Sequence, residues 1–344
     1  MSAPYSLAQQ IVLRKPYLLF VGRATTEADA KTALGIRDWA RESCLGQLRL
    51  SGSKVDLGLP EMSPEQAAQA GAGSLVIGVA PVGGQIPADW RDVLLRSARA
   101  GLDVVSGMRA RLEETPDLAA TARQASVALI DVRHCNGKFP IATGLKRPGK
   151  RLLTVGTDCA LGKKYTALAL TQAMRARGIR ADFRATGQTG ILIAGSGVAL
   201  DAVVGDFAAG AAEVLSPAAA TDHWDVIEGQ GSLFHPAYAG VSLALLHGSQ
   251  PDVMVLCHDP TRSHLNAFPH YPLPDLPSAI RSYREAARLT NPDARVAAIS
   301  LNTSVLSAAA RGRLLQETAD SLQLPCFDPM VGTLDDVLDT IGLS

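Results

Sequence analysis

The stretch LLTVGTDCALGKKYTALAL, residues 152–170, carries the strongest signal in the chain. It begins with an apolar run typical of a buried strand, passes through a loop that opens at Gly156 and closes at Gly162-Lys163, and ends in a helical pattern. Glycines let such a loop curl so that successive N–H groups point inward, the helix N-terminus adds partial positive charge, and Lys163 adds an ammonium group. The pattern predicts a phosphate-binding loop formed by Gly156, Thr157, Asp158, Cys159, Ala160, Leu161, Gly162, Lys163, Lys164 and Tyr165.

Two features of this loop depart from the common Walker pattern. Five residues separate Gly156 from Gly162 where that pattern has four, and Lys164 stands where Ser or Thr normally ligates Mg²⁺. The loop thereby resembles the variant phosphate loop of dethiobiotin synthetase and its relatives, which begins Gly-Thr-Asp as residues 156–158 do. A loop without the hydroxyl ligand and with a second lysine is better suited to holding a phosphate than to cleaving one. A strand-to-helix turn that binds nothing is the alternative.

The chain as a whole alternates short apolar runs with longer amphipathic ones, as βα units around a parallel sheet do. Its 344 residues exceed what a single core usually supports. The periodicity breaks at residues 134–150, which are rich in Gly, Pro and Lys and which we interpret as a domain junction. The prediction is an α/β chain with an N-terminal Rossmann-like domain, residues 1–140, and a C-terminal P-loop NTPase-like domain with a parallel sheet, residues 141–344.

The same patterns place the individual elements. In the first domain we expect strands at 17–21, 74–80, 102–106 and 127–132, and helices at 88–100 and 116–124. In the second we expect strands at 151–155, 180–185, 224–227, 252–257, 296–301 and 325–328, and helices at 163–177, 239–247, 277–289 and 307–322. The segment Gly187-Gln188-Thr189-Gly190 follows one of these strands, so it is expected at the same sheet edge as the phosphate loop.

Side chains able to transfer protons follow the strand at 224–227. Glu228 comes directly after it, and because the carboxyl ends of parallel strands share one edge, its carboxylate is expected beside the phosphate loop. Glu228 is the first candidate for a general base, and capping of a local N–H group is the alternative. His235 lies at the same rim, and histidine carries protons near neutral pH, although a structural role is equally open. Together with Lys163 these residues form the predicted catalytic set.

Histidines are frequent between residues 247 and 270 and invite a comparison with zinc sites. Their spacings are not those of a ligand pair on one helix or hairpin, so no metal site is predicted. The loop that contains Arg262, His264 and Asn266 is instead expected to contact a polar substrate.

Composition excludes several classes of partner. Lys+Arg and Asp+Glu balance at 33 each, which leaves no global field to attract nucleic acid or an acidic membrane. Residues 1–15 lack the apolar core of a signal peptide, and no stretch approaches the roughly 20 apolar residues of a membrane span. The five scattered cysteines argue against a disulfide framework and favour the reducing cytoplasm. We expect a small-molecule substrate and, from the frequency of symmetric assemblies, a homo-oligomer.

Besides the loop, three further segments resemble one known family: GQTG (187–190), DAVVGDFAAGAAE (201–213) and DHWDVIEGQGSLFHPAYAGVSLALLHGSQPD (222–252). With them the chain resembles, over nearly its whole length, a family long described as a domain of unknown function that includes the DgcN-type D-glutamate N-acetyltransferases. The resemblance implies transfer of an acetyl group from acetyl-CoA to the amino group of D-glutamate, within D-amino-acid breakdown. Coenzyme A carries a pyrophosphate and a ribose phosphate, which a loop with two lysines could bind without hydrolysis. The attacking amine needs a base such as Glu228 or His235.

Two other functions remain open from the residues. A ligase or kinase that uses Mg-ATP on a small carboxylate, similar to dethiobiotin synthetase, would take Asp158 and Glu228 as metal ligands, and Lys164 counts against it. A non-catalytic sensor of a nucleotide or of CoA is the third. The choice of acceptor rests on the resemblance alone.

Overall fold

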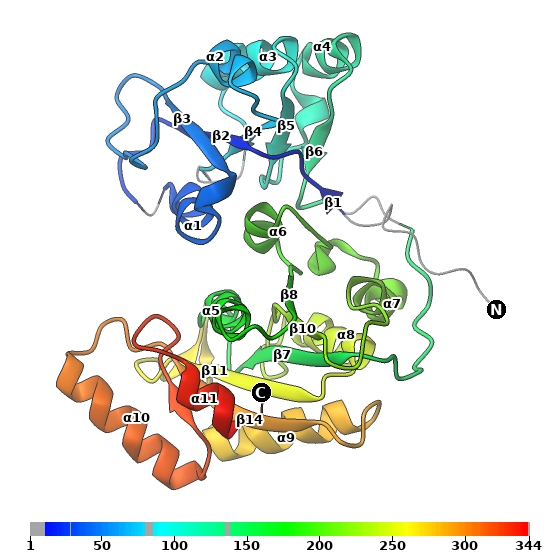
Figure 1. The fold of residues 1–344 in the computed structure, drawn as a ribbon, viewed down its shortest axis with the longest axis vertical. Helices are drawn as coiled ribbons and strands as arrows, with labels where there is room; N and C mark the ends of the chain where they lie inside the picture. Colours follow the sequence, from blue (N-terminus) through cyan, green and yellow to red (C-terminus); the bar gives the residue numbers. More distant parts are fainter. Residues whose placement is uncertain (1–10, 28, 80–84, 135–137, 343–344) are drawn as a thin grey trace. The chain divides into compact units, whose positions relative to one another are not determined.

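The computed structural model describes residues 11–27, 29–79, 85–134 and 138–342. These residues form two compact units, each built on a parallel sheet (Figure 1). The first unit takes the described residues up to 134 together with 187–202, and the second takes 138–186 and 203–342. The predicted α/β class is confirmed.

A five-stranded parallel sheet in the order β3-β2-β4-β5-β6 forms the core of the first unit. Its strands are β2 (Tyr17–Gly22), β3 (Cys44–Arg49), β4 (Ser74–Ile77), β5 (Asp103–Ser106) and β6 (Leu129–Asp131), and its helices are α1 (Lys31–Trp39), α2 (Pro64–Gln69), α3 (Arg91–Arg99) and α4 (Leu118–Ala125). Every residue of β2, β4 and β5 is buried, as is typical of parallel strands that are covered on both faces. The sequence did not predict β3 or α1.

Residues 187–202 add a helix and a short strand to this first unit. Helix α6 (Gln188–Ala194) packs against α1, and β9 (Ser196–Gly197) pairs antiparallel with β1 (Ile11–Val12). The segment Gly187-Gln188-Thr189-Gly190, expected at the edge of the second sheet, begins directly after Thr186, which bonds Glu228 at that edge, and continues into α6, which belongs to the first unit.

A six-stranded parallel sheet in the order β15-β14-β11-β7-β10-β8 forms the core of the second unit. Its strands are β7 (Lys150–Gly156), β8 (Ala181–Arg184), β10 (Trp224–Ile227), β11 (Val253–His258), β14 (Arg295–Leu301) and β15 (Cys326–Phe327). Its helices are α5 (Lys163–Ala176), α7 (Gly205–Leu215), α8 (Ala239–Ser249), α9 (Leu276–Arg288), α10 (Ala308–Leu322) and α11 (Asp335–Thr340), and β12 (His264–Leu265) and β13 (Phe268–Pro272) form a hairpin.

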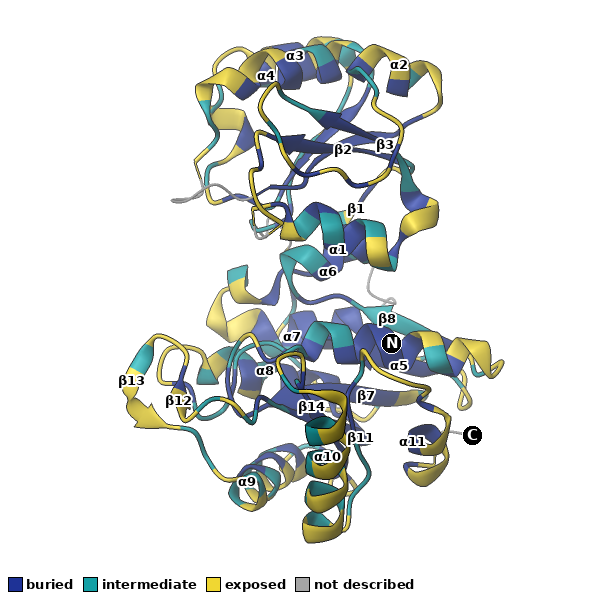
Figure 2. Cartoon of the chain, turned by 90° about the vertical axis from the view of Figure 1, so that its left-hand side faces the viewer, coloured by how far each residue is buried: buried dark blue, intermediate teal, exposed yellow. Residues whose placement is uncertain are grey.

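The position of β7 in this order determines where a ligand can bind. β7 lies between β11 and β10, so the strand order reverses around it, and ligands of open α/β sheets bind at the carboxyl ends of the strands at such a point. The inner strands β7, β10, β11 and β14 are mostly buried while many outward residues of the helices are exposed (Figure 2). No helix within the described part of the chain is long and apolar enough to cross a membrane.

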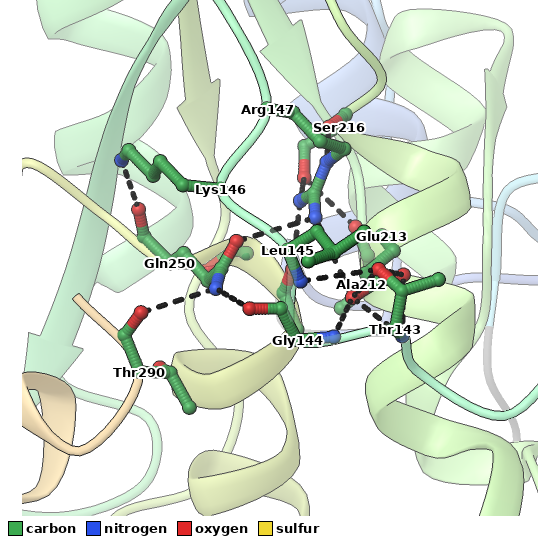
Figure 3. Close-up of polar contacts among 12 residues, drawn as sticks. Thr143, Gly144, Leu145, Lys146, Arg147, Ala212, Glu213, Ser216, Gln250 and Thr290 are labelled. Atoms are coloured by element: carbon green, nitrogen blue, oxygen red, sulfur yellow. Dashed lines mark hydrogen bonds and ion pairs between the residues drawn. The ribbon is translucent and has the colours of Figure 1, made fainter.

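Of the junction predicted at 134–150, the described residues 138–149 have no regular structure and are fastened to α7 and α8 by polar contacts (Figure 3). The buried carboxylate of Glu213 on α7 accepts hydrogen bonds from the N–H groups of Thr143 and Gly144, each at 3.0 Å, and from the Thr143 hydroxyl. Arg147 donates to the carbonyls of Ser216 and Gly248, at 3.0 and 2.7 Å. The junction is thus a fixed part of the second unit.

Candidate functional site

The loop 156–162 lies at the carboxyl end of β7 and leads directly into α5. Ala160 and Gly162 adopt left-handed backbone angles, with φ of 52° and 107°. Gly162 is the N-cap of α5 and makes no side-chain capping bond, and the first N–H groups of an α-helix cannot be bonded within the helix. This is the arrangement in which a helix N-terminus binds an anion.

Lys163 is the cation inside the loop. Its side chain is buried, and its Nζ donates to the carbonyl oxygen of Asp158 at 2.7 Å. Burial lowers the pKa of Lys163, whereas the nearby thiols of Cys257 and Cys159 and the carboxylates of Asp158 and Glu228 raise it. An anion in the loop would supply a stronger partner for this ammonium group than the carbonyl does.

Lys164 and Thr166, which follow in the first turn of α5, make contacts different from those of Lys163. The Nζ of Lys164 lies 4.4 Å from the centre of the Tyr165 ring. Thr166 is buried, and its Oγ1 lies 2.8 Å from the hydroxyl of Ser300 on β14. Thr166 therefore faces the core and does not replace the metal-ligating hydroxyl that Lys164 displaces.

The other side of the loop is held by residues between β11 and β13. Asp158 is fully buried, and its carboxylate accepts bonds from the N–H of Cys159 at 2.6 Å, from the N–H of Asn266 at 2.7 Å and from Arg262 at 3.2 Å. Arg262 also donates to the carbonyls of Cys159 and Ala160, at 2.9 and 2.8 Å. The sequence suggested that Arg262 and Asn266 contact a substrate, and the structure shows that both hold the loop.

Glu228 follows β10 directly and is buried beside the lysine of the loop. One of its carboxylate oxygens accepts a bond from the N–H of Thr186 at 3.0 Å, and the Thr186 hydroxyl donates to the Glu228 carbonyl at 2.7 Å. A Cβ atom on Gly229 would lie 1.7 Å from the carbonyl oxygen of Thr154 and 3.0 Å from Cδ of Lys163. Only glycine permits this approach, which places the end of β10 against both the end of β7 and the stem of Lys163.

His235 is buried at the rim of the same loop. Its ring stacks on Tyr238 with centres 4.6 Å apart and meets the edge of Phe268 on β13 at 4.7 Å. Its Nδ1 accepts a bond from the N–H of Ala237 at 3.2 Å, so a neutral ring carries its proton on Nε2. The ring is thereby fixed as a hydrogen-bond donor at Nε2.

Asp158, Cys159 and His235 come close enough to be considered as metal ligands, with one potential ligand atom of each within 4.8 Å of the others. Two properties of the group oppose this role. The Asp158 carboxylate already accepts from three donors. Burial raises the pKa of the Cys159 thiol, although Lys163 opposes the rise, and a protonated thiol is a poor metal ligand.

The buried Tyr283 and the half-buried His258, neither of which belongs to the predicted site, also contact the loop. The hydroxyl of Tyr283 on α9 donates to the carbonyl of Gly156 at 2.7 Å and accepts from the N–H of Leu233 at 3.1 Å, and burial raises its pKa to about 12. Nδ1 of His258 lies 2.9 Å from Oγ1 of Thr157, and burial lowers the pKa of His258. A local sequence pattern predicts neither contact with the loop, because each joins residues more than 100 positions apart. The bond between Leu233 and Tyr283 joins residues 50 positions apart.

Comparison with known families matches both parts of the chain. Residues 140–338 match the P-loop domain of DUF1611, described as a domain of unknown function, and residues 48–135 match the Rossmann-like N-terminal domain of the same family. The predicted pairing of a Rossmann-like and a P-loop domain is confirmed.

Characterised and solved relatives cover nearly the whole chain. A protein of Tritonibacter scottomollicae named D-glutamate N-acetyltransferase is 48% identical over 333 residues, which is 96% of this chain and 100% of the relative. A protein of a Pseudoalteromonas species with the same name is 45% identical over 95% of this chain and 98% of its own length. The crystal structure of a DUF1611 protein from Anabaena variabilis superposes with a TM-score of 0.83 at 35% identity, covering 96% of this chain and 100% of that one.

Proposed function

The chain belongs to the DUF1611 family, and on that premise we propose that it is an N-acetyltransferase that moves the acetyl group of acetyl-CoA to the amino group of D-glutamate. The observation that carries the proposal is the match to a D-glutamate N-acetyltransferase at 48% identity over 96% of this chain and 100% of the relative. The site is compatible with such chemistry, because it combines an anion cradle, a buried carboxylate and a fixed hydrogen-bond donor.

The cradle at 156–165 is the proposed site for the phosphates of coenzyme A. It offers the N-terminus of α5 and the ammonium group of Lys163, with Lys164 as a second cation at the loop. Acetyl transfer requires no cleavage of a phosphate, so a loop that lacks the metal-ligating hydroxyl loses nothing for this reaction. Thr166, bonded to Ser300 in the core, supports the same conclusion.

Glu228 is the proposed general base. The amino group of an amino acid must lose a proton before it attacks the thioester, and a buried carboxylate beside Lys163 can accept that proton. The bond from Thr186 to one oxygen keeps the carboxylate oriented. The amine then forms the amide bond as the carbon–sulfur bond breaks, and the released thiolate of coenzyme A takes up a proton.

His235 is proposed to stabilise the developing oxyanion. A neutral His235 has its acceptor nitrogen occupied by the N–H of Ala237, so the ring is a better donor than base. A donor aimed at the carbonyl oxygen of the thioester lowers the barrier to its tetrahedral intermediate. The nearby aromatic rings of Tyr238 and Phe268 hold the imidazole in place.

The length of coenzyme A sets a condition on this arrangement. Its pantetheine arm has about four residue-sized units and extends to roughly 14 Å at about 3.5 Å for each unit. With the pyrophosphate in the loop, the thioester reaches Glu228 and His235 only if the arm folds back over the loop. The proposal therefore includes a folded arm, covered by the rim of Tyr238 and Phe268.

Two variants test the assignment. Glu228→Gln is expected to lower kcat for acetyl transfer by about 100-fold or more while acetyl-CoA still binds. Lys163→Ala is expected to weaken acetyl-CoA binding, measured by titration calorimetry with a chelator present. If Glu228→Gln keeps its kcat and only loses affinity for acetyl-CoA, the arm does not fold back and the base lies elsewhere.

Assembly and cellular location stay predictions. The described cysteines, Cys44, Cys159, Cys257 and Cys326, are all unpaired by disulfides, which supports the reducing cytoplasm. A homo-oligomer follows only from the general frequency of symmetric assemblies among enzymes.

A further inference from the structure

The sheet of the first unit has its own point at which the strand order reverses. β2 is followed along the chain by β3 on one side, and the chain then returns to β4 on the other side of β2. Connections that leave in opposite directions open a crevice between the loops after β2 and β4, where doubly wound sheets bind their ligands. The acetyl-transfer proposal makes no use of this place.

A pocket of about 290 Å³ lies there, which we call the switch pocket. Its described lining comes from the loop after β2 and from the segment that follows β4: Arg23, Ala24, Asp29, Val79, Pro87, Asp89 and Trp90. The volume suits a small metabolite, close to the lower limit of typical ligand sites.

The apolar wall of the switch pocket is rigid. Trp90 is buried and meets the ring of Phe20 on β2 edge-on, with centres 5.0 Å apart and planes at 87°. The neighbouring Gly78 follows β4 so closely against α1 that a Cβ atom there would lie 2.4 Å from Cβ of Ala33. A wall held by these contacts keeps its shape when a ligand enters.

The polar side of the switch pocket carries both signs of charge. Arg23 and Asp89 form an ion pair at 2.9 Å, with 56% and 43% of their side chains exposed. Exposed pairs of this kind add little to stability, so a ligand that brings one group of each sign can replace the pair at small cost. Asp29, which accepts bonds from the N–H groups of Thr26 and Thr25, adds a second carboxylate.

The charges of the residues that line the switch pocket restrict which ligands can bind there. Among the described lining residues there are two carboxylates and one guanidinium group, so a ligand must bring a positive group and cannot carry a net negative charge without repulsion. A carboxylate on the ligand fits Arg23, and an ammonium group fits Asp89.

We propose that the switch pocket binds a free α-amino acid with a neutral, apolar side chain, with its carboxylate on Arg23, its ammonium group on Asp89 and its side chain against Val79, Pro87 and Trp90. Glutamate, with a net negative charge, is disfavoured, so this is not the site of the acetyl acceptor. The inference rests on the first unit alone and stands or falls independently of the acetyl-transfer reaction.

Titration calorimetry without acetyl-CoA tests the proposal on the full chain. The ligands are both enantiomers of leucine, methionine and glutamate. Saturable binding of leucine or methionine at one site, tighter than that of glutamate, is expected. Absence of binding by leucine and methionine at millimolar concentrations, or tighter binding of glutamate at a site that Asp89 does not affect, overturns the proposal.

Matched variants assign any observed binding to the pocket. Asp89→Asn and Arg23→Gln each remove one charge contact and should weaken binding by about tenfold, as expected for loss of one charge-assisted hydrogen bond. Glu65→Gln is the control, because Glu65 forms an equally exposed pair with Arg96 at 2.8 Å in the same unit, away from the pocket lining. Unchanged affinity in both pocket variants, with unfolding midpoints equal to the control, would place the ligand elsewhere and refute the assignment.

Discussion

Gly229 is the residue at which the fold and the site depend on one another most directly. Substitution by alanine adds a Cβ atom 1.7 Å from the carbonyl oxygen of Thr154 and 3.0 Å from Cδ of Lys163. The first contact is with backbone and cannot be relieved by a rotamer change, so the ends of β10 and β7 must move apart. Overpacking of this kind costs about 1–3 kcal/mol. The bond from the N–H of Gly229 to Oγ1 of Thr154, at 2.9 Å, would be lost as well, at about 1 kcal/mol.

We therefore expect Gly229→Ala to lower the free energy of unfolding of the second unit by about 3 kcal/mol. Urea unfolding followed by tryptophan fluorescence measures it, with Trp224 on β10 as the reporter inside the second unit. Gly240→Ala on α8 is the matched control, because a Cβ atom there meets nothing within 4 Å. A helical glycine replaced by alanine should gain about 0.5 kcal/mol. The reasoning fails if the two variants unfold at the same urea concentration.

Three further perturbations probe the support of the second unit. Glu213→Gln should destabilise that unit by about 2 kcal/mol, because the buried carboxylate accepts bonds from two N–H groups and a hydroxyl of the junction. The destabilisation should appear as a lower urea midpoint of unfolding. An unchanged midpoint would show that the junction is not fastened there. Tyr283→Phe should cost about 1–2 kcal/mol in the same assay, since it leaves the carbonyl of Gly156 without its buried donor, and a variant as stable as the wild type would contradict this. Burial lowers the pKa of His258 in the folded chain. Below the pKa of an unfolded histidine, about 6.5, the unfolded chain therefore binds a proton at this residue more readily than the folded chain does. The stability from this group is present above that pH and is lost as the pH falls, so the stability difference between the wild type and His258→Asn should shrink from pH 7 toward about pH 5, and a constant difference would refute it.

Local patterns were sufficient to predict most of the second unit. The apolar strands at 151–155, 252–257 and 296–301 correspond to β7, β11 and β14, and the helix predicted at 307–322 corresponds to α10. Each of these has a strong signal, because buried parallel strands are apolar throughout and Ser307 caps its helix by accepting a bond from the N–H of Ala310.

Where the sequence was insufficient, the structure depends on distant partners. β3 was missed because CLGQLR contains Gly46 and Gln47, and the buried Gln47 is stabilised by bonds to Asp56 and to the N–H of Leu57. The placement of 187–202 in the first unit has no local signal, because it arises from packing of α6 on α1 and pairing of β9 with β1.

The candidate site shows the same division. The sequence identified the loop, Glu228 and His235, and the structure places all of them at one edge of the second sheet. It did not identify Thr186 as the partner of Glu228 or Arg262 as a clamp on the loop, since each contact joins elements that are far apart in the chain. The catalytic roles of Glu228 and His235 remain proposals.

The most direct test is the reaction itself, measured with purified protein, acetyl-CoA and D-glutamate in the presence of a metal chelator, beside a parallel assay with Mg-ATP and no chelator. The proposal predicts release of free coenzyme A thiol in step with formation of N-acetyl-D-glutamate, a much lower rate with L-glutamate, and no release of ADP when Mg-ATP replaces acetyl-CoA. ADP release from Mg-ATP with a small carboxylate, and no thiol release from acetyl-CoA with any amino acid tested, would contradict it.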